Sequence, residues 1–290
     1  MRQEQTGSTS SMVQAWELGI RLKERREQLG LTVMAAGKAS NVGGTNLSTV
    51  ESGKRKLTVS KLADLASFYE FTKSEMSTLN ALRTGADSRD WYHDYTRIYS
   101  DEFIRYLGFE AGAEAMWNYQ GDVVPGLLQT TDYARAMIQG GGPYIRPVDV
   151  EPRLESRLAR QARLKDTQPL KFSAVIGQAA LLQQVGGPAV MRRQLEHLAD
   201  MIKDANNVEL RVMPFGTGAH PLIGNSLTML SFPSPRLPEV LWQETATAQT
   251  IVDRRSTLME AKASFDDVAE RALDYKGSLT LIRRVIKETG

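Results

Sequence analysis

Residues 41–56, NVGGTNLSTVESGKRK, combine three glycines, several small hydroxyl and amide side chains, and a run of three cations. If residues 45–52 form a helix, Leu47 and Val50 lie three positions apart and give that helix an apolar inner face. The outer face then presents Gly44, Thr45, Asn46 and Thr49.

These outer side chains suit the base-pair edges of a DNA major groove. The Asn46 amide can both donate to and accept from adenine, and the threonines can offer hydroxyls to bases or methyl groups to thymine. Gly43 and Gly44 at the start of the helix would let a phosphate approach free backbone N–H groups. The pattern therefore predicts a helix that reads DNA.

The cations that follow this helix point to the same partner. Lys54, Arg55 and Lys56 would lie over the phosphate backbone and add affinity that does not depend on base sequence. Residues 12–84 hold eleven Lys or Arg against seven Asp or Glu, a net charge of +4, although the whole chain carries only +2. We expect double-stranded DNA as the partner of this front domain.

Five short helices in residues 12–84 are expected to hold the motif. The first follows AWELGIRLKERREQL and ends at Gly30, Thr32 caps the second, and the third ends at Gly53. Ser60 is expected to cap the fourth, and KSEMSTLNALR forms the fifth. Residues 1–11 are polar and unpatterned, and predict a disordered lead.

Residues 85–290 predict a larger, mixed α+β domain, so the whole chain is expected to be α+β. Strands are expected in AEAMWNYQ, LKFSAVIG, NVELRVMP, NSLTMLSF and EVLWQE. The segment EPRLESRLARQARLKD predicts a long helix with leucines on one stripe and arginines on the other. Two further helices are expected at residues 257–273 and 277–288.

Residues 22–56 resemble the helix-turn-helix of the Xre (lambda-repressor-like) family. The matching features are the LG-L-T entry to the second helix, the twenty residues 32–51, and ESGKR after the recognition helix. The resemblance implies that Arg26 pairs with Glu51 and braces the motif from inside. Arginine is suited to this role because its guanidinium can hold a carboxylate with two parallel hydrogen bonds.

Two positions depart from the family pattern and keep a second function open. Val33 stands where the family usually has glutamine as the first residue of the second helix. Gly43 and Gly44 stand where it usually has a Ser or Thr cap followed by a long polar or basic residue. The alternative is a protein-interaction module that sequesters a partner and keeps a degenerate helix-turn-helix.

From residue 91 the chain resembles a domain of uncharacterised function, often described as antitoxin-like, that follows the helix-turn-helix in many actinobacterial transcription regulators. The matching segments include WYHDY, VVPGLLQTTDYARAMI, VGGPAVMRRQLEHL and VELRVMPFGTGAHP, whereas the tail from Thr245 departs from the pattern. The resemblance implies a domain that senses a small molecule or a small partner protein. A homodimer is expected, because one recognition helix makes few base contacts.

The sequence predicts no catalytic residue, no metal site and no cofactor. Cysteine is absent, which removes thiolate nucleophiles, thiolate metal ligands and disulfides. The three histidines, His93, His197 and His220, lie outside any zinc-binding or nucleophile motif. No run of 18 apolar residues and no apolar leader is present, so we expect a cytoplasmic protein without a membrane partner.

Overall fold

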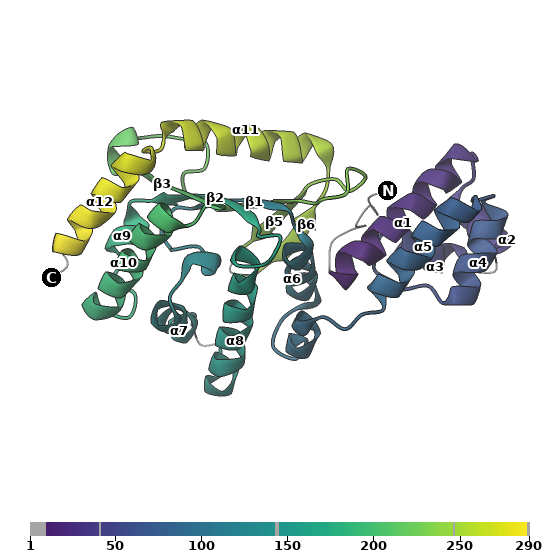
Figure 1. Ribbon diagram of the computed structural model, residues 1–290, viewed down its shortest axis with the longest axis horizontal. Coiled ribbons are helices and arrows are strands. Elements are labelled where there is room, and N and C mark those ends of the chain that lie inside the picture. Colours follow the sequence, from purple (N-terminus) through teal and green to yellow (C-terminus); the bar gives the residue numbers. More distant parts are fainter. Residues whose placement is uncertain (1–9, 41, 143–144, 246, 289–290) are drawn as a thin grey trace. The chain divides into compact units, whose positions relative to one another are not determined.

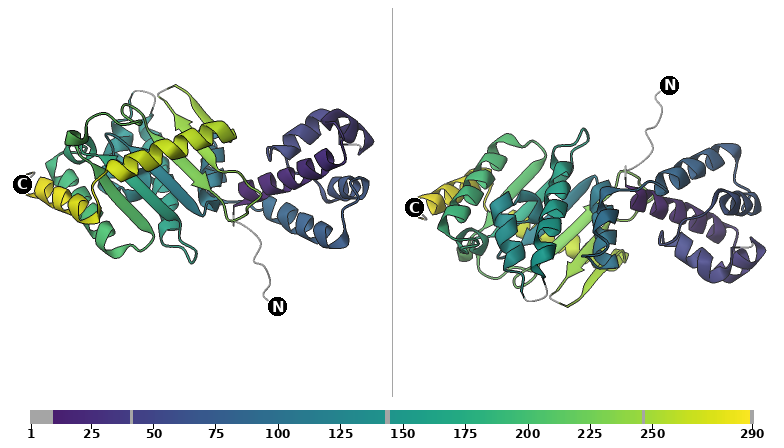
Figure 2. Two further views of the ribbon diagram at one scale, coloured as in Figure 1. Left: turned by 90° about the horizontal axis from the view of Figure 1, so that it is seen from above. Right: turned by 90° about the horizontal axis from the view of Figure 1, so that it is seen from below.

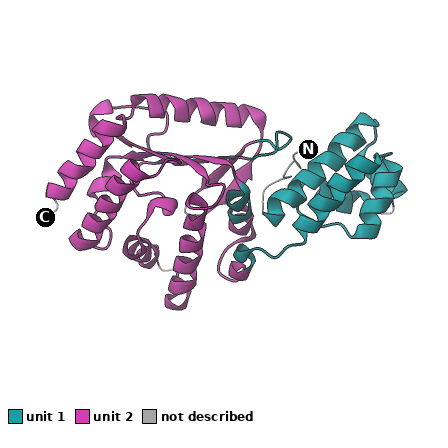
Figure 3. Ribbon diagram, in the orientation of Figure 1, with its two compact units in different colours: residues 1–93, 107–112, 232–238 teal, residues 94–106, 113–231, 239–290 magenta. Residues whose placement is uncertain are grey.

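The computed structural model describes residues 10–40, 42–142, 145–245 and 247–288 of the chain. These residues form two compact units, shown in Figure 3. Unit 1 holds residues 1–93 together with 107–112 and 232–238, and unit 2 holds residues 94–106, 113–231 and 239–290. The predicted boundary between residues 84 and 85 falls within the last helix of the front domain, and two later segments of the chain also belong to unit 1.

Unit 1 contains the five predicted helices (Figure 1). They are α1 (Ser11–Gln28), α2 (Val33–Ala39), α3 (Gly44–Glu51), α4 (Val59–Phe68) and α5 (Lys73–Ala86). Their apolar faces share one core, in which Leu22, Leu47 and Leu62 are fully buried. Burying a leucine side chain contributes about 1.5–3 kcal/mol, so this core holds the short helices in place.

Local capping sets where these helices begin and end. Thr32 caps α2 as expected, because its side chain accepts a hydrogen bond from the backbone N–H of Ala35 at 3.1 Å. The prediction for α4 was wrong: Thr58, not Ser60, is the cap, and its hydroxyl accepts from the backbone N–H of Lys61. Threonine 58 precedes the first helical residue, whereas Ser60 already lies inside the helix.

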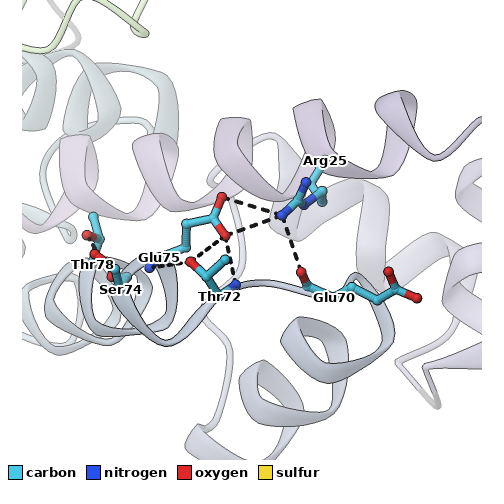
Figure 4. A network of polar contacts seen from close by, with 6 residues as sticks. All are labelled: Arg25, Glu70, Thr72, Ser74, Glu75 and Thr78. Atoms are coloured by element: carbon cyan, nitrogen blue, oxygen red, sulfur yellow. Dashed lines mark hydrogen bonds and ion pairs between the residues drawn. The ribbon is translucent and has the colours of Figure 1, made fainter.

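A capping box begins α5 (Figure 4). The Thr72 hydroxyl accepts from the backbone N–H of Glu75, and the Glu75 carboxylate accepts from the backbone N–H of Thr72 at 2.7 Å. Arg25 of α1 lies 3.3 Å from the same carboxylate and also donates to the carbonyl of Glu70. This network joins the first and last helices of the motif.

The start of α1 differs from the predicted disordered lead. Residues 1–9 lie outside the described residues, but Ser10 and Ser11 are buried. The Ser10 hydroxyl donates to the carbonyl of Gly108 at 2.6 Å, and the Ser11 hydroxyl lies 3.0 Å from the Tyr92 hydroxyl. These partners are about 80 to 100 residues away in sequence, so local composition did not indicate them.

Unit 2 is built on a six-stranded mixed sheet with the order β3-β2-β1-β4-β5-β6. The strands are β1 (Ala115–Gln120), β2 (Lys171–Gly177), β3 (Val208–Met213), β4 (Leu227–Ser231), β5 (Val240–Glu244) and β6 (Gln249–Val252). The first three are parallel to each other, and β4, β5 and β6 each run antiparallel to their neighbours. All five predicted strands are present, and β6 was not predicted.

Helices cover both faces of this sheet (Figures 1 and 2). On one face lies α11 (Arg255–Arg271), and on the other lie α7 (Thr131–Gln139), α8 (Val150–Gln161) and α10 (Pro188–Asp204). The remaining helices are α6 (Asp101–Gly112), α9 (Ala179–Leu182) and α12 (Tyr275–Glu288). Short 3-10 turns are η1 (Trp91–Tyr95), η2 (Gly126–Leu128), η3 (Pro147–Asp149), η4 (Ala162–Leu164) and η5 (Phe215–Thr217). The chain is therefore α+β, as predicted.

Side chains of β1 alternate between the two faces of the sheet. Tyr119 packs with Leu258 and Phe265 of α11, and the Lys262 ammonium lies 4.2 Å from the Trp117 ring centroid. Asn118 therefore faces the opposite side, toward α8. Across the described ranges, no helix is long and apolar enough to span a membrane.

Candidate nucleic-acid interface

A buried ion pair holds α3 against α1. The Arg26 guanidinium donates from Nε to Glu51 Oε1 at 2.6 Å and from Nη2 to Glu51 Oε2 at 2.9 Å. Both side chains are about 7% exposed or less, and Arg26 also donates to the carbonyl of Leu31 at 2.8 Å. The ion pair implied by the family resemblance is present, and its hydrogen bond with Glu51 raises the pKa of Arg26.

Tyr69 lies beside this pair and is fully buried. Burial raises its pKa to about 12, and the Glu51 carboxylate adds to the rise. The ring therefore stays neutral and contributes packing instead of charge. The Arg26–Glu51 pair is thus largely shielded from solvent, and it holds Glu51, the last residue of α3, against α1.

Glycine at position 19 sets the distance between α1 and α3. A Cβ at Gly19 would overlap the carbonyl oxygen of Val50 and lie 2.7 Å from that of Glu51. The two helix backbones are thus in direct contact at this point. The sequence interpretation missed this role, because a single glycine within an amphipathic helix carries no signal of its own.

The exposed face of α3 differs in part from the predicted one. Thr45 is exposed, and so is Ser48, which sequence reasoning did not select. Ser48 lies three residues after Thr45 and therefore shares its face, which is the signal that could have identified it. Asn46 and Thr49 are only partly exposed.

Asn46 is engaged in hydrogen bonds within unit 1. Its amide Nδ2 donates to the carbonyl of Val42 at 3.0 Å, and its Oδ1 accepts from Arg55 Nη1 at 2.5 Å. The Thr49 hydroxyl donates to the carbonyl of Asn46 at 2.7 Å. The predicted residues Asn46, Thr49 and Arg55 thus lie together, and Asn46 must exchange these bonds to contact a base.

Gly43 and Gly44 form the entry to α3. Gly43 is its N-cap with φ of +84°, a conformation that favours glycine, and its N–H donates to the carbonyl of Gly37 at 2.8 Å. Gly44 lies against Met34 of α2, where a side chain would overlap the sulfur atom. Gly43 is therefore required by its backbone conformation, and Gly44 by its packing between α2 and α3. The predicted turn also includes Asn41, which lies outside the described residues.

The basic segment follows directly on α3. Gly53 has φ of +70°, and the backbone N–H groups of Lys54 and Arg55 both donate to the carbonyl of Thr49, at 2.9 and 3.1 Å. Lys54, Arg55 and Lys56 are all exposed. Together with Thr45 and Ser48 they make a surface of small hydroxyls beside three cations, which can accept a phosphate backbone and reach base edges.

Histidines and carboxylates do not gather at this surface. His93 Nδ1 lies 3.1 Å from the carbonyl of Asp90, and His220 Nε2 lies 3.3 Å from the Tyr119 hydroxyl. His197 lies on α10, where burial lowers its pKa. In the part of the chain that the structure describes, no group of three or more His, Asp or Glu could hold a metal ion.

Two family models match this sequence. One is described as a helix-turn-helix domain and matches residues 17–79. The other is described as a domain of unknown function (DUF5753) and matches residues 103–284. No curated protein and no solved structure gives a significant match to the chain. The helix-turn-helix match covers most of α1, all of α2 to α4 and the first half of α5. This domain is typical of DNA-binding regulators.

Proposed function

We propose that this chain, which belongs to the DUF5753 family and carries a helix-turn-helix domain, is a sequence-specific DNA-binding regulator of transcription. The observation that carries the proposal is the exposed surface of α3 and the cations that follow it, Lys54, Arg55 and Lys56. The Arg26–Glu51 pair supports it, because a buried ion pair at the end of α3 fixes the orientation of the reading helix.

The proposal extends to the assembly and to unit 2. The regulator acts as a homodimer in the cytoplasm, because two recognition helices on two half-sites supply the specificity that one lacks. Unit 2 senses a small ligand or a small partner protein, in keeping with the antitoxin-like resemblance of its sequence. The resemblance of residues 22–56 to the Xre family supports the same role. No catalytic step belongs to this function.

Genome-wide DNA occupancy of the tagged full-length protein tests the first part of the proposal. We expect discrete peaks that share a short sequence and that the double variant Asn46→Ala, Thr49→Ala loses. Ser77→Ala, an exposed position on α5, is the matched control and should keep the peaks. An absence of peaks in the unmodified protein would overturn the proposal.

The structure also favours one alternative, the interaction module with a degenerate helix-turn-helix. Asn46 is bonded to Val42 and Arg55, the N–H of Gly43 donates to Gly37, and Gly44 packs against Met34. Fewer groups therefore remain for DNA. Salt-dependent DNA affinity distinguishes the two functions. Lys54→Gln with Lys56→Gln should reduce the salt slope by about one per lysine if these side chains contact phosphates.

The control for this measurement is Lys73→Gln, which removes an exposed cation at the start of α5. It should leave the salt slope unchanged. If the unmodified chain shows no salt-dependent affinity for DNA, the alternative holds. If it binds DNA and the double lysine variant keeps the same salt slope, Lys54 and Lys56 do not contact phosphates.

A further inference from the structure

A cavity of about 370 Å³ lies in unit 2. Alternate residues of the sheet line one side of it, including Asn118 and Gln120 of β1, Thr228 of β4 and Trp242 of β5. Residues of α6, α7, α8 and the segment around Pro125 line the rest of the cavity. The volume lies within the range of about 300–1,000 Å³ that is typical of sites for small molecules.

Three arginines of α8 line this cavity: Arg153, Arg157 and Arg160. Their spacing of four and three residues places them on one face of the helix. The sequence interpretation placed the arginines opposite the leucine stripe, but that face covers a cavity. Because two further guanidiniums lie near Arg157, the site concentrates positive charge.

Within the described ranges no carboxylate forms an ion pair with Arg157, although the more distant charge of Glu244 acts to raise its pKa. Its Nη1 donates to the neutral amide oxygen of Gln129 at 2.8 Å. Burial, with a further contribution from Arg160, lowers its pKa to about 10. A guanidinium withdrawn from water without a counterion is costly, and an anion in the cavity would remove that cost.

Arg153 is similar. Its Nη2 donates to the carbonyl of Ile98 at 2.7 Å, and its guanidinium carbon lies 4.8 Å from the centroid of the Tyr99 ring. Its Nε is buried without a hydrogen-bond partner among the residues that the structure describes. Arg153 and Arg157 can therefore both turn donors toward one anionic group.

A flat apolar wall stands beside the arginines. The rings of Tyr106 and Trp242 are stacked, with centroids 4.7 Å apart and planes inclined by 24°. Phe103 contacts both rings at centroid distances of 5.7 and 5.9 Å. These three side chains all line the cavity, so a planar ligand can lie against aromatic surface.

One buried acceptor completes the site. Asn118 is 3% exposed, and its Nδ2 donates to Thr228 Oγ1 at 2.8 Å and to the carbonyl of Leu227 at 3.3 Å. The backbone carbonyl of Leu227 can only accept a hydrogen bond, so the Asn118 amide must turn its NH2 group toward it. This orientation leaves Asn118 Oδ1 as the free acceptor. That atom has no partner among the described residues. It calls for a hydroxyl or amine donor on the ligand.

Glu244 is the carboxylate that lines the same cavity, and it is exposed. It accepts from Gln249 Nε2 at 2.6 Å and from Trp242 Nε1 at 3.4 Å, so it is held by neutral groups at the edge of the sheet. Among the residues that line the cavity, one carboxylate against Arg153 and Arg157 leaves a positive balance of charge. The site therefore favours an anionic ligand over a cationic one.

We propose that this cavity is the effector site of unit 2 and binds a small organic anion, a carboxylate or a phosphate monoester, that carries a planar ring. The anionic group contacts Arg153 and Arg157, and the ring lies against Tyr106 and Trp242. This inference rests on the sensing role in the proposed function and gives that role a place and a ligand chemistry.

Four matched probes test the proposal by calorimetric titration of the full-length protein without DNA. They are 1-naphthyl phosphate, 1-naphthoate, 1-naphthol and inorganic phosphate. We expect at least one ring-bearing anion to bind at least about ten-fold more tightly than both the neutral ring and the ring-free ion. The phosphate and carboxylate arms distinguish the two kinds of anionic group.

Substitutions of arginines test whether the probes bind in this cavity. Arg157→Gln should weaken the anionic probes at least about ten-fold, whereas Arg192→Gln, an exposed arginine of α10, should leave them unchanged. If the glutamine variant fails to fold, Arg157→Lys keeps the charge but loses the planar fork, and a smaller loss is expected.

Three results would overturn the proposal. They are no binding of either ring-bearing anion at millimolar concentration, equal binding of inorganic phosphate and naphthyl phosphate, and Arg157 variants that bind as the unmodified chain does. Because DNA is absent from the titration, such a result leaves the DNA-binding proposal intact. A failed occupancy experiment, in turn, does not affect this site.

Discussion

Arg26 is a buried guanidinium in unit 1 and Arg157 is a half-buried one in unit 2, and they differ in what faces them. Arg26 holds the Glu51 carboxylate with two hydrogen bonds, so its charge is neutralised within the fold. Arg157 faces the neutral amide of Gln129 beside a cavity. The Arg26–Glu51 pair stabilises the fold of unit 1. Arg157 keeps a charge that is not neutralised within the fold and that a bound anion can neutralise. Arg26 therefore positions α3, whereas Arg157 is available to bind a ligand.

The largest expected effect follows from breaking the satisfied pair. Glu51→Ala leaves Arg26 buried without its partner and should lower the free energy of unfolding of unit 1 by about 3–5 kcal/mol. Hydrogen exchange at the amides of α1 and α3 measures this loss locally. The double variant Arg26→Met, Glu51→Met should recover most of it, since neither charge then remains buried. Unchanged exchange in Glu51→Ala would show that the pair has no stabilising role.

The same contrast explains what the sequence could and could not predict. The ion pair and the basic segment follow a local pattern within residues 22–56, and helices α1 to α5 follow from apolar spacing and capping residues. The cavity draws its residues from positions as distant as Tyr99 and Gln249, which only the folded sheet brings together. Arginines on a helix with a leucine stripe look solvent-facing in sequence, whether or not another element covers them.

The smaller omissions have separate physical origins. Ser48 was missed because the inner face was inferred from Leu47 and Val50 alone, without following the exposed face from Thr45. Strand β6 spans only four residues and is largely unburied, so no apolar alternation indicates it. Gly19 acts through a contact with Val50, 31 positions later in the chain. Of these three, Gly19 depends on a partner that is distant in sequence, whereas the signal for Ser48 was local.

A second prediction concerns the contact that lets the satisfied pair form. Gly19→Ala places a methyl group against the carbonyl oxygens of Val50 and Glu51, so α3 must move away from α1. We expect unit 1 to lose about 1–3 kcal/mol, as overpacked sites do. Hydrogen exchange of α3 reports the loss. Lys23→Ala, exposed on the same helix, is the control and should change stability little. If Gly19→Ala left the free energy of unfolding of unit 1 unchanged, α1 and α3 could move apart without loss of stability.

The third prediction tests the unsatisfied arginine directly. Arg157→Gln should change the free energy of unfolding of the ligand-free chain by less than about 1 kcal/mol, because it removes an uncompensated charge along with one hydrogen bond. Denaturant unfolding of unit 2 measures this. A loss as large as that of Glu51→Ala would indicate that Arg157 is a structural residue and would remove the contrast between the two arginines.

The smallest expected effect comes from an exposed ion pair, that of Arg25 and Glu75 (Figure 4). Hydrogen bonds from the Thr72 backbone and hydroxyl hold the pKa of Glu75 below its ordinary value of 4.5. The ionised form is thus favoured in the folded state, and its contribution is present above pH 4.5 and lost as the pH falls through the folded pKa. Glu75→Gln should therefore be less stable than the unmodified chain at pH 7, and the difference should shrink by pH 3.

Thermal unfolding at the two pH values measures this difference, and Glu70→Gln serves as the control. The Glu70 carboxylate is exposed and points away from Arg25, which contacts only its backbone carbonyl (Figure 4). Removing its charge should leave the melting temperature nearly unchanged at both pH values. If the difference in melting temperature between Glu75→Gln and the unmodified chain stayed constant from pH 7 to pH 3, the charge of Glu75 would not contribute to the capping box. In that case exposed charge in unit 1 adds nothing to its stability, and the buried Arg26–Glu51 pair accounts for the electrostatic part.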